Sequence, residues 1–331
     1  MSTLSKKQTT LRLRADLIKG IRSFFDQQGF LEVDTPLLVR CPGMEPHISA
    51  FETTFEDQTH YFHTSPEYAM KRLLCAGYEK IYQICKTFRD EPLGKMHNPE
   101  FTMLEWYRAH ADYTTIMHDT EHLIASLATT LFDSPILHYN NHTIDLTPPW
   151  PRLSLHDALT QYAQITADPF TQTHLFIQQA REQGHTNVEQ SDSADIAFFK
   201  VFLDAVEKHL GTNKPTFLID YPASMAALAT RKKETPHLAE RFELYIAGIE
   251  LANAFTELTD PVEQRARFKE EQQQRRKENN PIYPVDETFL NALQDGMPPS
   301  GGIALGVDRL LMLFSKKSSI QEVIAFPFPT L

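Results

Sequence analysis

The stretch KIYQICKTFRDEPLGKMHNPEFTMLEWYR (Lys80–Arg108) decides the fold. Its flanks are rich in strand-forming residues and its middle holds a proline and a glycine, so it predicts an antiparallel hairpin with a long loop. Strand side chains alternate between faces. One face therefore carries Phe101, Met103, Glu105 and Tyr107 on the return strand, while Arg89 shares a face with Glu91. If the face that carries these charged residues is buried, it requires a polar ligand, because unpaired buried charge costs several kcal/mol. The alternative is that this face is exposed to solvent.

A second segment, PSGGIALGVDRLLML (Pro299–Leu313), is a glycine-rich strand that runs into a helix from about Val307. Arg309 then lies in the first turn of the helix, beside an N-terminus that favours anions. The two segments therefore each offer one arginine, Arg89 and Arg309, to the phosphates of a nucleotide.

The segment RFELYIAGIELANAFTEL (Arg241–Leu258) predicts a hairpin with a tight turn at Ala247-Gly248. With that turn, Glu243 faces Ala252. Glu243 and Glu250 become diagonal neighbours on one face, ~7–8 Å apart at the backbone. Two carboxylates in this arrangement repel each other unless a cation lies between them, and magnesium is the natural candidate. Two solvated glutamates are the alternative.

The end of the same segment holds two further polar residues. Asn253 and Glu257 have the opposite strand parity from Glu250, so a regular strand would turn them away from it. A bulge near Ala252–Ala254 would bring all three to one pocket.

The string TSPEYAMKRLL (Thr64–Leu74) follows a short strand and predicts a helix. Ser65 is a good N-cap, Pro66 suits the first helical position, and Gly77 ends the helix. Glu67 complements the helix dipole, so on these grounds alone the segment needs no functional role.

The other segments predict mostly helices. An amphipathic helix over Leu11–Gln28 ends at Gly29 and precedes an edge strand. VEQRARFKEEQQQRRKENN (Val262–Asn280) alternates charge signs and predicts a solvated helix without a nucleic-acid role. We expect one domain, 1–331, with a helical insertion at about 109–211. The helices expected in the insertion are Thr114–Leu131, Leu153–Tyr162, Thr173–Glu182 and Ala194–His209.

Composition fits a globular protein in a reducing compartment. Of the 331 residues, 41% are hydrophobic and 23% charged, and there is neither a signal-peptide pattern nor an apolar run of the ~18 residues that a membrane span needs. The cysteines Cys41, Cys75 and Cys85 lack paired spacing, so we expect neither disulfides nor zinc, and a cytoplasmic location. The net charge of −11 argues weakly against a large nucleic-acid footprint.

FRDE with HNPEFTMLEWY resembles motif 2 of the class II aminoacyl-tRNA synthetases, and GIALGVDRLLML resembles their motif 3. The helix and strand after Leu11 resemble motif 1, which implies a homodimer. The resemblance implies an α+β fold, an antiparallel sheet flanked by helices. It also implies that Arg89 contacts the α-phosphate of ATP, and that Arg309 holds the departing pyrophosphate. The ATP-binding set that it implies is Arg89, Asp90, Glu91, His97, Asn98, Phe101, Glu250, Leu251, Gly306 and Arg309, with Mg²⁺ on Glu243 and Glu250.

The resemblance is to the lysine-type enzymes in particular. HNPEFTMLEWY and ELANAFTEL are similar to their motifs, and Glu105 with Tyr107 resembles the pair that receives the side-chain ammonium of the substrate. The implied substrate-binding residues are Ser65, Pro66, Glu67, Glu105, Tyr107, Asn253, Glu257 and Ala304.

The chain also resembles the elongation factor P–lysine ligases, which are lysyl-tRNA synthetase paralogues without an anticodon-binding OB-fold domain. Motif 1 begins near residue 11, so no such domain is expected before it. Ser65 and Ala304 support this resemblance, because lysyl-tRNA synthetases often have alanine and usually have glycine there. Ala254 departs from the usual glycine of the family and leaves the bulge uncertain.

This resemblance implies activation of (R)-β-lysine by ATP, then transfer to a lysine ε-amine of elongation factor P, with tRNA binding not expected. A tRNA-aminoacylating enzyme and a non-catalytic regulatory paralogue are the alternatives.

Overall fold

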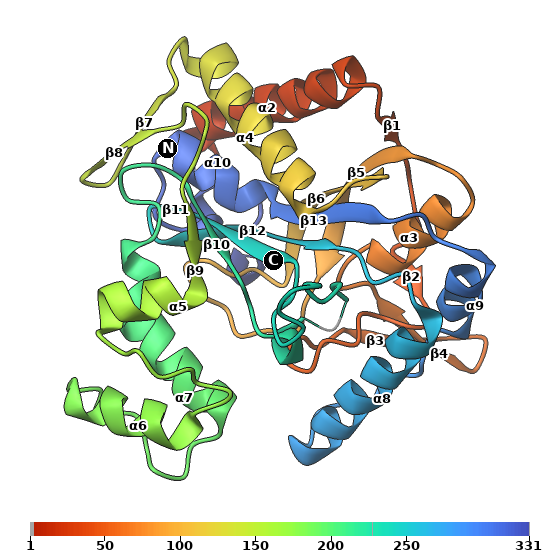
Figure 1. Ribbon diagram of the computed structural model, residues 1–331. Helices are drawn as coiled ribbons and strands as arrows, with labels where there is room; N and C mark the ends of the chain where they lie inside the picture. Colours follow the sequence, from red (N-terminus) through yellow and green to blue (C-terminus); the bar gives the residue numbers. More distant parts are fainter. Residues whose placement is uncertain (1–2, 227, 331) are drawn as a thin grey trace.

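The computed structural model describes residues 3–226 and 228–330. An eight-stranded sheet runs through the middle of the molecule (Figure 1). From one edge to the other its strands are β1 (Leu31–Glu32), β5 (Lys80–Phe88), β6 (Glu100–Ala109), β13 (Ser300–Gly306), β12 (Ile249–Thr256), β11 (Arg241–Ile246), β10 (Thr216–Ile219) and β9 (Arg152–Ser154).

The hairpin predicted at Lys80–Arg108 is present as the second and third strands of this sheet, counted from the β1 edge. β5 and β6 pair antiparallel, with Lys80 opposite Arg108 and Phe88 opposite Glu100. β13 then pairs with β6 on one side and with β12 on the other, also antiparallel. Only the edge strands β1 and β9 pair in parallel among the strands described for this sheet. The predicted α+β class with a mainly antiparallel sheet is confirmed.

Long helices cover one face of the sheet. These are α2 (Gln8–Gln27), α4 (Tyr113–Phe132) and α10 (Val307–Ser315), and α10 contacts both α2 and β6. Side chains such as Phe25 pack with sheet residues such as Trp106 in the largest apolar cluster. The predicted amphipathic helix and the helix from Val307 are thus both confirmed, and both lie over this core.

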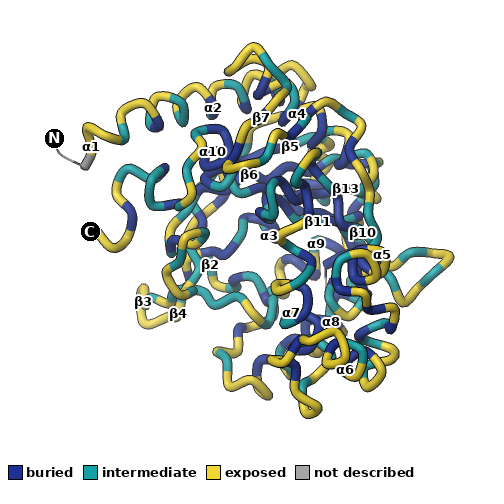
Figure 2. Tube along the Cα trace, turned by 90° about the vertical axis from the view of Figure 1, so that its left-hand side faces the viewer, coloured by how far each residue is buried: buried dark blue, intermediate teal, exposed yellow. Residues whose placement is uncertain are grey.

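The opposite face carries α3 (Glu67–Cys75), α8 (Pro261–Lys277) and α9 (Glu287–Asp295). A second apolar cluster there includes Ile81 and Tyr107, whose strand parity is opposite to that of Tyr82 and Trp106 in the first cluster. Figure 2 shows the sheet strands as the buried interior between these layers.

The prediction that the helix after Val262 is solvated is wrong. On α8, Arg267, Glu271 and Arg275 are buried, and Arg275 is completely inaccessible. Its guanidinium donates hydrogen bonds to the carbonyls of Met44, Glu45, Ile48 and Pro281. Charge patterning alone could not show this, because a buried arginine is tolerated when loop carbonyls satisfy its donors.

The segment expected to be a helical insertion, 109–211, also contains three strands. β9 extends the main sheet, β7 (Ile136–Tyr139) and β8 (His142–Asp145) form a separate hairpin, and α4 belongs to the core layer described above. The helices after β9 surround their own apolar cluster, which includes Phe176 and Phe198. We call residues 155–209 the helical lobe, seen in green at the lower left of Figure 1. Its elements are α5 (Leu155–Ala158), η1 (Leu159–Ala163), α6 (Thr173–Glu182), α7 (Ala194–Val201), η2 (Phe202–Val206) and η3 (Glu207–His209).

The remaining elements are short. They are α1 (Thr3–Lys6), η4 (Ala223–Met225), η5 (Ile320–Glu322), η6 (Phe328–Thr330) and a three-stranded sheet of β2 (Leu38–Val39), β4 (Gln58–Phe62) and β3 (Glu52–Phe55). Cys41, Cys75 and Cys85 are free thiols, as predicted. No helix of the described residues has the length and apolar character that a membrane crossing requires.

Candidate active site

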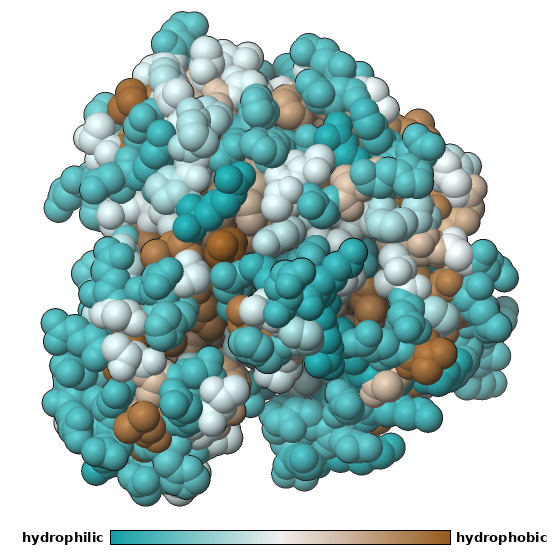
Figure 3. All heavy atoms as spheres, in the orientation of Figure 1, coloured by the Kyte–Doolittle hydropathy of each residue, from teal (hydrophilic) through white to brown (hydrophobic). Residues whose placement is uncertain are grey.

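A cavity of about 1070 Å³ opens on the second face of the sheet, with walls from the helical lobe and from α8. Figure 3 shows the surface hollowed between these parts. All the residues predicted to bind ATP, substrate or metal line this cavity except Asp90 and Pro66. The predicted residues that line it are Ser65, Glu67, Arg89, Glu91, His97, Asn98, Phe101, Glu105, Tyr107, Glu243, Glu250, Leu251, Asn253, Glu257, Ala304, Gly306 and Arg309.

The floor of the cavity consists of two parallel rows of cross-strand neighbours. One row runs across β6, β13, β12 and β11, and the next lies two residues along each strand. The first row is Glu105, Ala304, Asn253 and Glu243; the second is Tyr107, Gly302, Phe255 and Arg241. A Cβ at Gly302 would overlap the Glu257 carboxylate and the Tyr107 ring, so glycine is required there. Ala304, an implied substrate-binding residue, lies in the first of these rows.

The register of β11 and β12 corrects one prediction. The turn at Ala247-Gly248 and the pair Ile246–Ile249 are as predicted, but Glu243 faces Asn253 rather than Ala252. The pairing shifts between Tyr245, opposite Glu250, and Leu244, opposite Ala252, so Leu251 is the extra residue. The bulge therefore precedes the predicted Ala252–Ala254.

This bulge has a consequence for the cavity. It changes the strand parity between Glu250 and Asn253, so both side chains line the same cavity. Asn253 then lies in the first floor row, directly between Ala304 and Glu243.

Buried carboxylates gather on the side of the cavity near α3. Glu105 is 1% exposed; its Oε1 accepts a hydrogen bond from the Ser65 hydroxyl (2.6 Å), and its Oε2 accepts one from the Tyr107 hydroxyl (3.0 Å). Burial and the charge of Glu67 raise the pKa of Glu105 to about 8. This carboxyl therefore takes up a proton near neutral pH unless a cation binds next to it.

A lysine that was not predicted bridges two of the predicted carboxylates. Lys71 is fully buried, and its Nζ contacts Glu67 and lies 2.5 Å from Oε2 of Glu257. Burial alone would lower its pKa, but the charges of Glu257 and Glu67 outweigh that effect and raise it. We call Glu67, Lys71, Glu105 and Glu257 the carboxylate end. Three carboxylates there face one ammonium. The group therefore has more negative than positive charge, and a second cation would be bound favourably.

The arginine end consists of Arg89, His97, Phe101 and Arg309. The Arg89 guanidinium lies 5.4 Å from the Phe101 ring centroid, and its buried Nε has no hydrogen-bond partner. Arg309 donates to the Glu250 carbonyl (2.7 Å) and lies 3.1 Å from Nε2 of His97. Burial and the positive charge of Arg309 lower the pKa of His97, so this imidazole is neutral near pH 7.

A buried aspartate fixes the position of Arg309. Asp308 accepts hydrogen bonds from the Thr102 amide of β6 (2.6 Å) and from Arg14 of α2 (2.5 Å). These bonds tie the start of α10 to the sheet. Arg309, the next residue, is therefore held over the cavity by a rigid support.

Some residues predicted to bind a ligand contact other parts of the protein or lie outside the cavity. Asn98 uses its whole side chain on the protein: its amide nitrogen donates to the Glu100 carbonyl (2.6 Å), and its oxygen accepts from the Phe328 amide (3.0 Å). Asp90 is exposed and lies outside the cavity. Pro66 is buried at the N-cap of α3, which begins at Glu67, one residue later than predicted. Ser65 bonds the Glu67 amide (3.0 Å) from just before the cap position.

The proposed metal ligands each have an arginine nearby. Glu243 accepts hydrogen bonds from Arg241 (2.5 Å), Tyr221 (2.5 Å) and Tyr245 (2.7 Å). Glu250 lies 3.6 Å from Arg309. Burial and the charge of Glu243 raise the pKa of Glu250, so a cation at this pair would relieve repulsion.

The chemistry of the pair fits magnesium. No group of three or more metal-binding side chains occurs among residues 3–226 and 228–330. Magnesium commonly takes one or two carboxylates together with substrate phosphates and water, so two carboxylates beside a phosphate site suffice.

Sequence reasoning missed several residues of the cavity. Phe255 and Arg241 share strand parity with Asn253 and Glu243, which was a usable signal. Lys71 lies four residues after Glu67 on one helix, the spacing of an ion pair. Glu45, in an irregular loop, and Glu271, on a helix predicted to be solvated, carried no such signal. Missed residues that line the cavity include Glu45, Arg241, Phe255 and Glu271.

Comparison with known proteins agrees with the fold. Residues 2–330 match the family "tRNA synthetases class II (D, K and N)", and the chain belongs to this family. It is 40% identical over 318 residues to the lysine–tRNA ligase of Pelotomaculum thermopropionicum, covering 95% of this chain and 62% of that protein. It is 41% identical over 317 residues to that of Moorella thermoacetica, covering 95% and 64%. The chain thus spans less than two thirds of the length of these relatives.

Proposed function

We propose that the protein activates a lysine-type amino acid with ATP and transfers the aminoacyl group to a lysine ε-amine of elongation factor P, in the cytoplasm. The observation that carries the proposal is the separation of charge within one cavity. Phe101 and Glu105 are four residues apart on β6, so roughly 13 Å of strand separates the arginine end from the carboxylate end. The arginine end suits phosphates, and the carboxylate end suits an ammonium group.

In the first step, a carboxylate oxygen of the amino acid attacks the α-phosphate of ATP, and pyrophosphate leaves. Arg89 binds the α-phosphate and Arg309 the pyrophosphate, so both guanidinium groups meet charge that develops in the transition state. Bound magnesium, held by Glu243 and Glu250, would neutralise phosphate charge. Glu105 and Tyr107 orient the amino acid through its side-chain ammonium.

In the second step, the acceptor amine attacks the carbonyl carbon of the adenylate. An amide bond forms, the bond to the phosphate oxygen breaks, the nitrogen loses a proton, and AMP leaves. The protein supplies positioning and electrostatic stabilisation, and no serine or cysteine nucleophile is required.

The choice of β-lysine is supported by two side chains of the cavity. Ser65 donates its hydroxyl hydrogen to Glu105, and the Ala304 methyl lies on the floor between Glu105 and Asn253. Both change the space and polarity next to the ammonium pocket. They favour an amine position different from that of ordinary lysine.

A second candidate is aminoacylation of tRNA, which the identity of about two in five residues to lysine–tRNA ligases favours. Both candidates share the first step. Amino-acid-dependent ATP–pyrophosphate exchange therefore tests activation, with α-lysine, (R)-β-lysine and other amino acids compared. Transfer of radiolabelled product to purified tRNA and to elongation factor P then separates the two acceptors. Exchange without any lysine preference would contradict the proposal.

We also propose a homodimer formed through the segment after α2. Exposed large apolar side chains are concentrated there, as a subunit interface requires. They are Leu31, Leu37, Leu38, Phe55 and Phe62. Light scattering after size-exclusion chromatography tests this, and a monomer mass at micromolar concentration would contradict it.

A further inference from the structure

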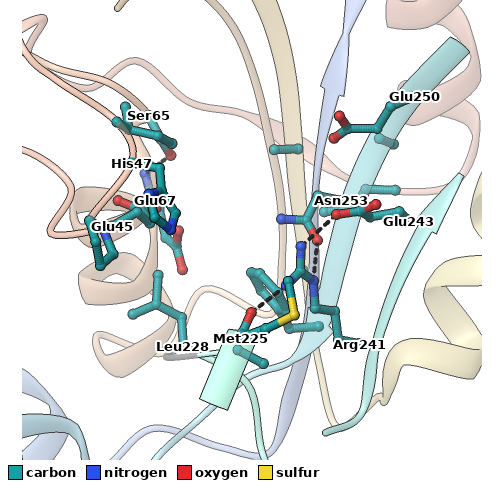
Figure 4. A pocket seen from close by; sticks show the side chains of 18 of the residues that line it. Glu45, His47, Ser65, Glu67, Met225, Leu228, Arg241, Glu243, Glu250 and Asn253 are labelled. Atoms are coloured by element: carbon teal, nitrogen blue, oxygen red, sulfur yellow. Dashed lines mark hydrogen bonds and ion pairs between the residues drawn. The ribbon is translucent and has the colours of Figure 1, made fainter. Parts of the chain in front are cut away.

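Two glutamates outside the family motifs form a separate acidic wall of the cavity. Glu45 lies in the loop before β3, and Glu271 lies on α8; both line the cavity. Glu271 is 8% exposed, and its Oε2 has no hydrogen-bond partner. Oε2 of Glu45 is likewise buried without a partner. Figure 4 shows Glu45 beside Glu67, across the cavity from Arg241 and Glu243.

The protein holds this wall rigidly. Arg275 donates to the carbonyls of Met44 (3.1 Å) and Glu45 (2.6 Å) and to that of Ile48, and Asn280 donates to the carbonyl of Pro46 (3.1 Å). The loop that carries Glu45 is therefore anchored to α8 and to the residues after it. A buried carboxylate on so firmly held a backbone has little freedom to turn toward water.

Among residues 3–226 and 228–330, no cation lies within ion-pair distance of the Glu45 or Glu271 carboxylate. The nearby guanidinium groups bind elsewhere: Arg275 takes the loop carbonyls, and Arg267 donates to the carbonyls of Ala226 (2.8 Å) and Ala229 (2.7 Å). The Lys71 ammonium lies between Glu67 and Glu257. Burial, followed by the charge of Glu45, raises the pKa of Glu271 to about 8. Unpaired buried carboxylates on a cavity wall are costly, and the cost is recovered when a ligand brings a positive charge.

We propose that Glu45 and Glu271 form a second ammonium subsite, distinct from the pocket of Glu105 and Tyr107, that binds a primary amine of the reactants. This rests on the proposed function and refines it. Unlike Glu243 and Glu250, the wall has no phosphate site beside it to complete a metal's ligands, because Glu45 lies across the cavity from that pair (Figure 4). No group of three or more metal-binding side chains occurs among the described residues. A primary ammonium needs only a few acceptors and matches a reaction whose amino acid and acceptor both carry amines. Its source is either the second amine of the activated lysine or the ε-amine of the acceptor.

Two arms of one experiment separate these sources. Glu45→Gln, Glu271→Gln and the double variant keep side-chain shape and remove charge; Glu79→Gln, at an exposed position just before β5, is the matched control. In the first arm, ATP–pyrophosphate exchange compares lysine with 6-aminohexanoate, which lacks the second amine. If the subsite binds the second amine of lysine, the wild-type preference for lysine falls about tenfold or more in the double variant, while the KM for ATP stays unchanged.

In the second arm, adenylate formed in advance is chased with elongation factor P in a single turnover. If the subsite binds the acceptor amine, transfer slows about tenfold or more while the first arm is unaffected. Unchanged behaviour in both arms would overturn the proposal. An equal loss with lysine, 6-aminohexanoate and ATP would also overturn it, because that pattern marks a purely structural role.

The failure of the proposed function would look different. If the wild type supports no exchange with any amino acid, activation itself is refuted, and the subsite is then judged with 1,5-diaminopentane alone. Saturable thermal stabilisation of the wild type that is absent in Glu45→Gln and Glu271→Gln would support the subsite. No stabilisation of the wild type would overturn it.

Discussion

The two ends of the cavity are built in opposite ways. At the carboxylate end, Lys71, Glu105 and Glu257 are at most 1% exposed, and each already contacts another ionic or polar side chain. At the arginine end, the side chains of Arg309 and His97 are 21% and 50% exposed. Arg89 lies over Phe101 with an unpartnered Nε. The first end is therefore part of the folded core, while the second keeps its charges available to a ligand. Substitutions at the arginine end should affect catalysis with little change in stability, while substitutions at the carboxylate end can affect both stability and amino-acid binding.

The largest effect on stability should come from Lys71→Met. It leaves Glu67 and Glu257 as buried carboxylates without their cation, which typically costs ~3–5 kcal/mol of unfolding free energy. Urea denaturation measures the loss. Lys19→Met, which breaks an exposed pair with Asp16, is the control and should cost under ~1 kcal/mol. Equal losses in the two variants would contradict the contrast between the two ends.

Arg89→Ala and Arg309→Ala should instead abolish activation. In the proposed reaction each guanidinium group meets phosphate charge that grows during transfer, and losing one such contact costs ~3 kcal/mol or more, about 100-fold in rate. ATP–pyrophosphate exchange measures this, with a thermal melt beside it that should change little. Arg265→Ala, at an exposed ion pair with Glu287, should retain exchange. Near-normal exchange in Arg89→Ala or Arg309→Ala would refute the phosphate assignment.

Glu105→Gln should raise the KM for the amino acid by about 30-fold or more, because a charge-assisted contact to an ammonium is worth ~2–3 kcal/mol. The KM for ATP should stay within about twofold, since the nucleotide binds at the other end. Steady-state exchange with each substrate varied separately measures both constants. If both rise together, Glu105 supports the cavity rather than reading the amino acid.

The same carboxyl predicts a pH dependence. The Glu105 pKa of about 8 means that the free site is largely protonated at pH 6.5, and the substrate ammonium must displace that proton. The KM for the amino acid should therefore fall as pH rises from 6.5 to 8, by up to about tenfold per pH unit. Glu105→Gln should reduce this dependence, and what remains comes from Glu257 and Glu271, because burial raises the pKa of each of these carboxyls to about 8 as well. A wild-type KM independent of pH over this range would contradict it.

The smallest effect concerns the choice of amino acid. The Ala304 methyl lies between Glu105 and Asn253 on the floor, in space that glycine would leave for the α-amine of ordinary lysine. Ala304→Gly should improve kcat/KM for α-lysine relative to β-lysine by about tenfold, since one methyl in a tight pocket gives ~1–3 kcal/mol of discrimination. An unchanged ratio would return α-lysine to consideration as the natural substrate.

The same contrast explains what the sequence could predict. Phe101 lies in a regular strand, Arg89 directly follows one, and Arg309 lies at a helix start, all within recognisable motifs. Strand parity also placed Phe101, Glu105 and Tyr107 on one face correctly. Parity failed at Glu243 because a single extra residue, Leu251, shifts the register, and a bulge has little sequence signature. Glu45 and Glu271 could not be found from the sequence, because their positions depend on Arg275. The Arg275 guanidinium binds the carbonyls of Met44 and Glu45, which lie more than 200 residues away in the sequence.

In the proposed function, this cavity makes a lysyl-type adenylate and delivers the aminoacyl group to a protein amine. The most direct measurement is the intact mass of elongation factor P after incubation with the enzyme, ATP and either α-lysine or (R)-β-lysine, with tRNA present in the same reaction. The account predicts that elongation factor P gains the mass of one lysyl residue on a single lysine, faster with the β-isomer, and that the gain is lost with Arg89→Ala. Unmodified elongation factor P together with lysine-charged tRNA would contradict the account.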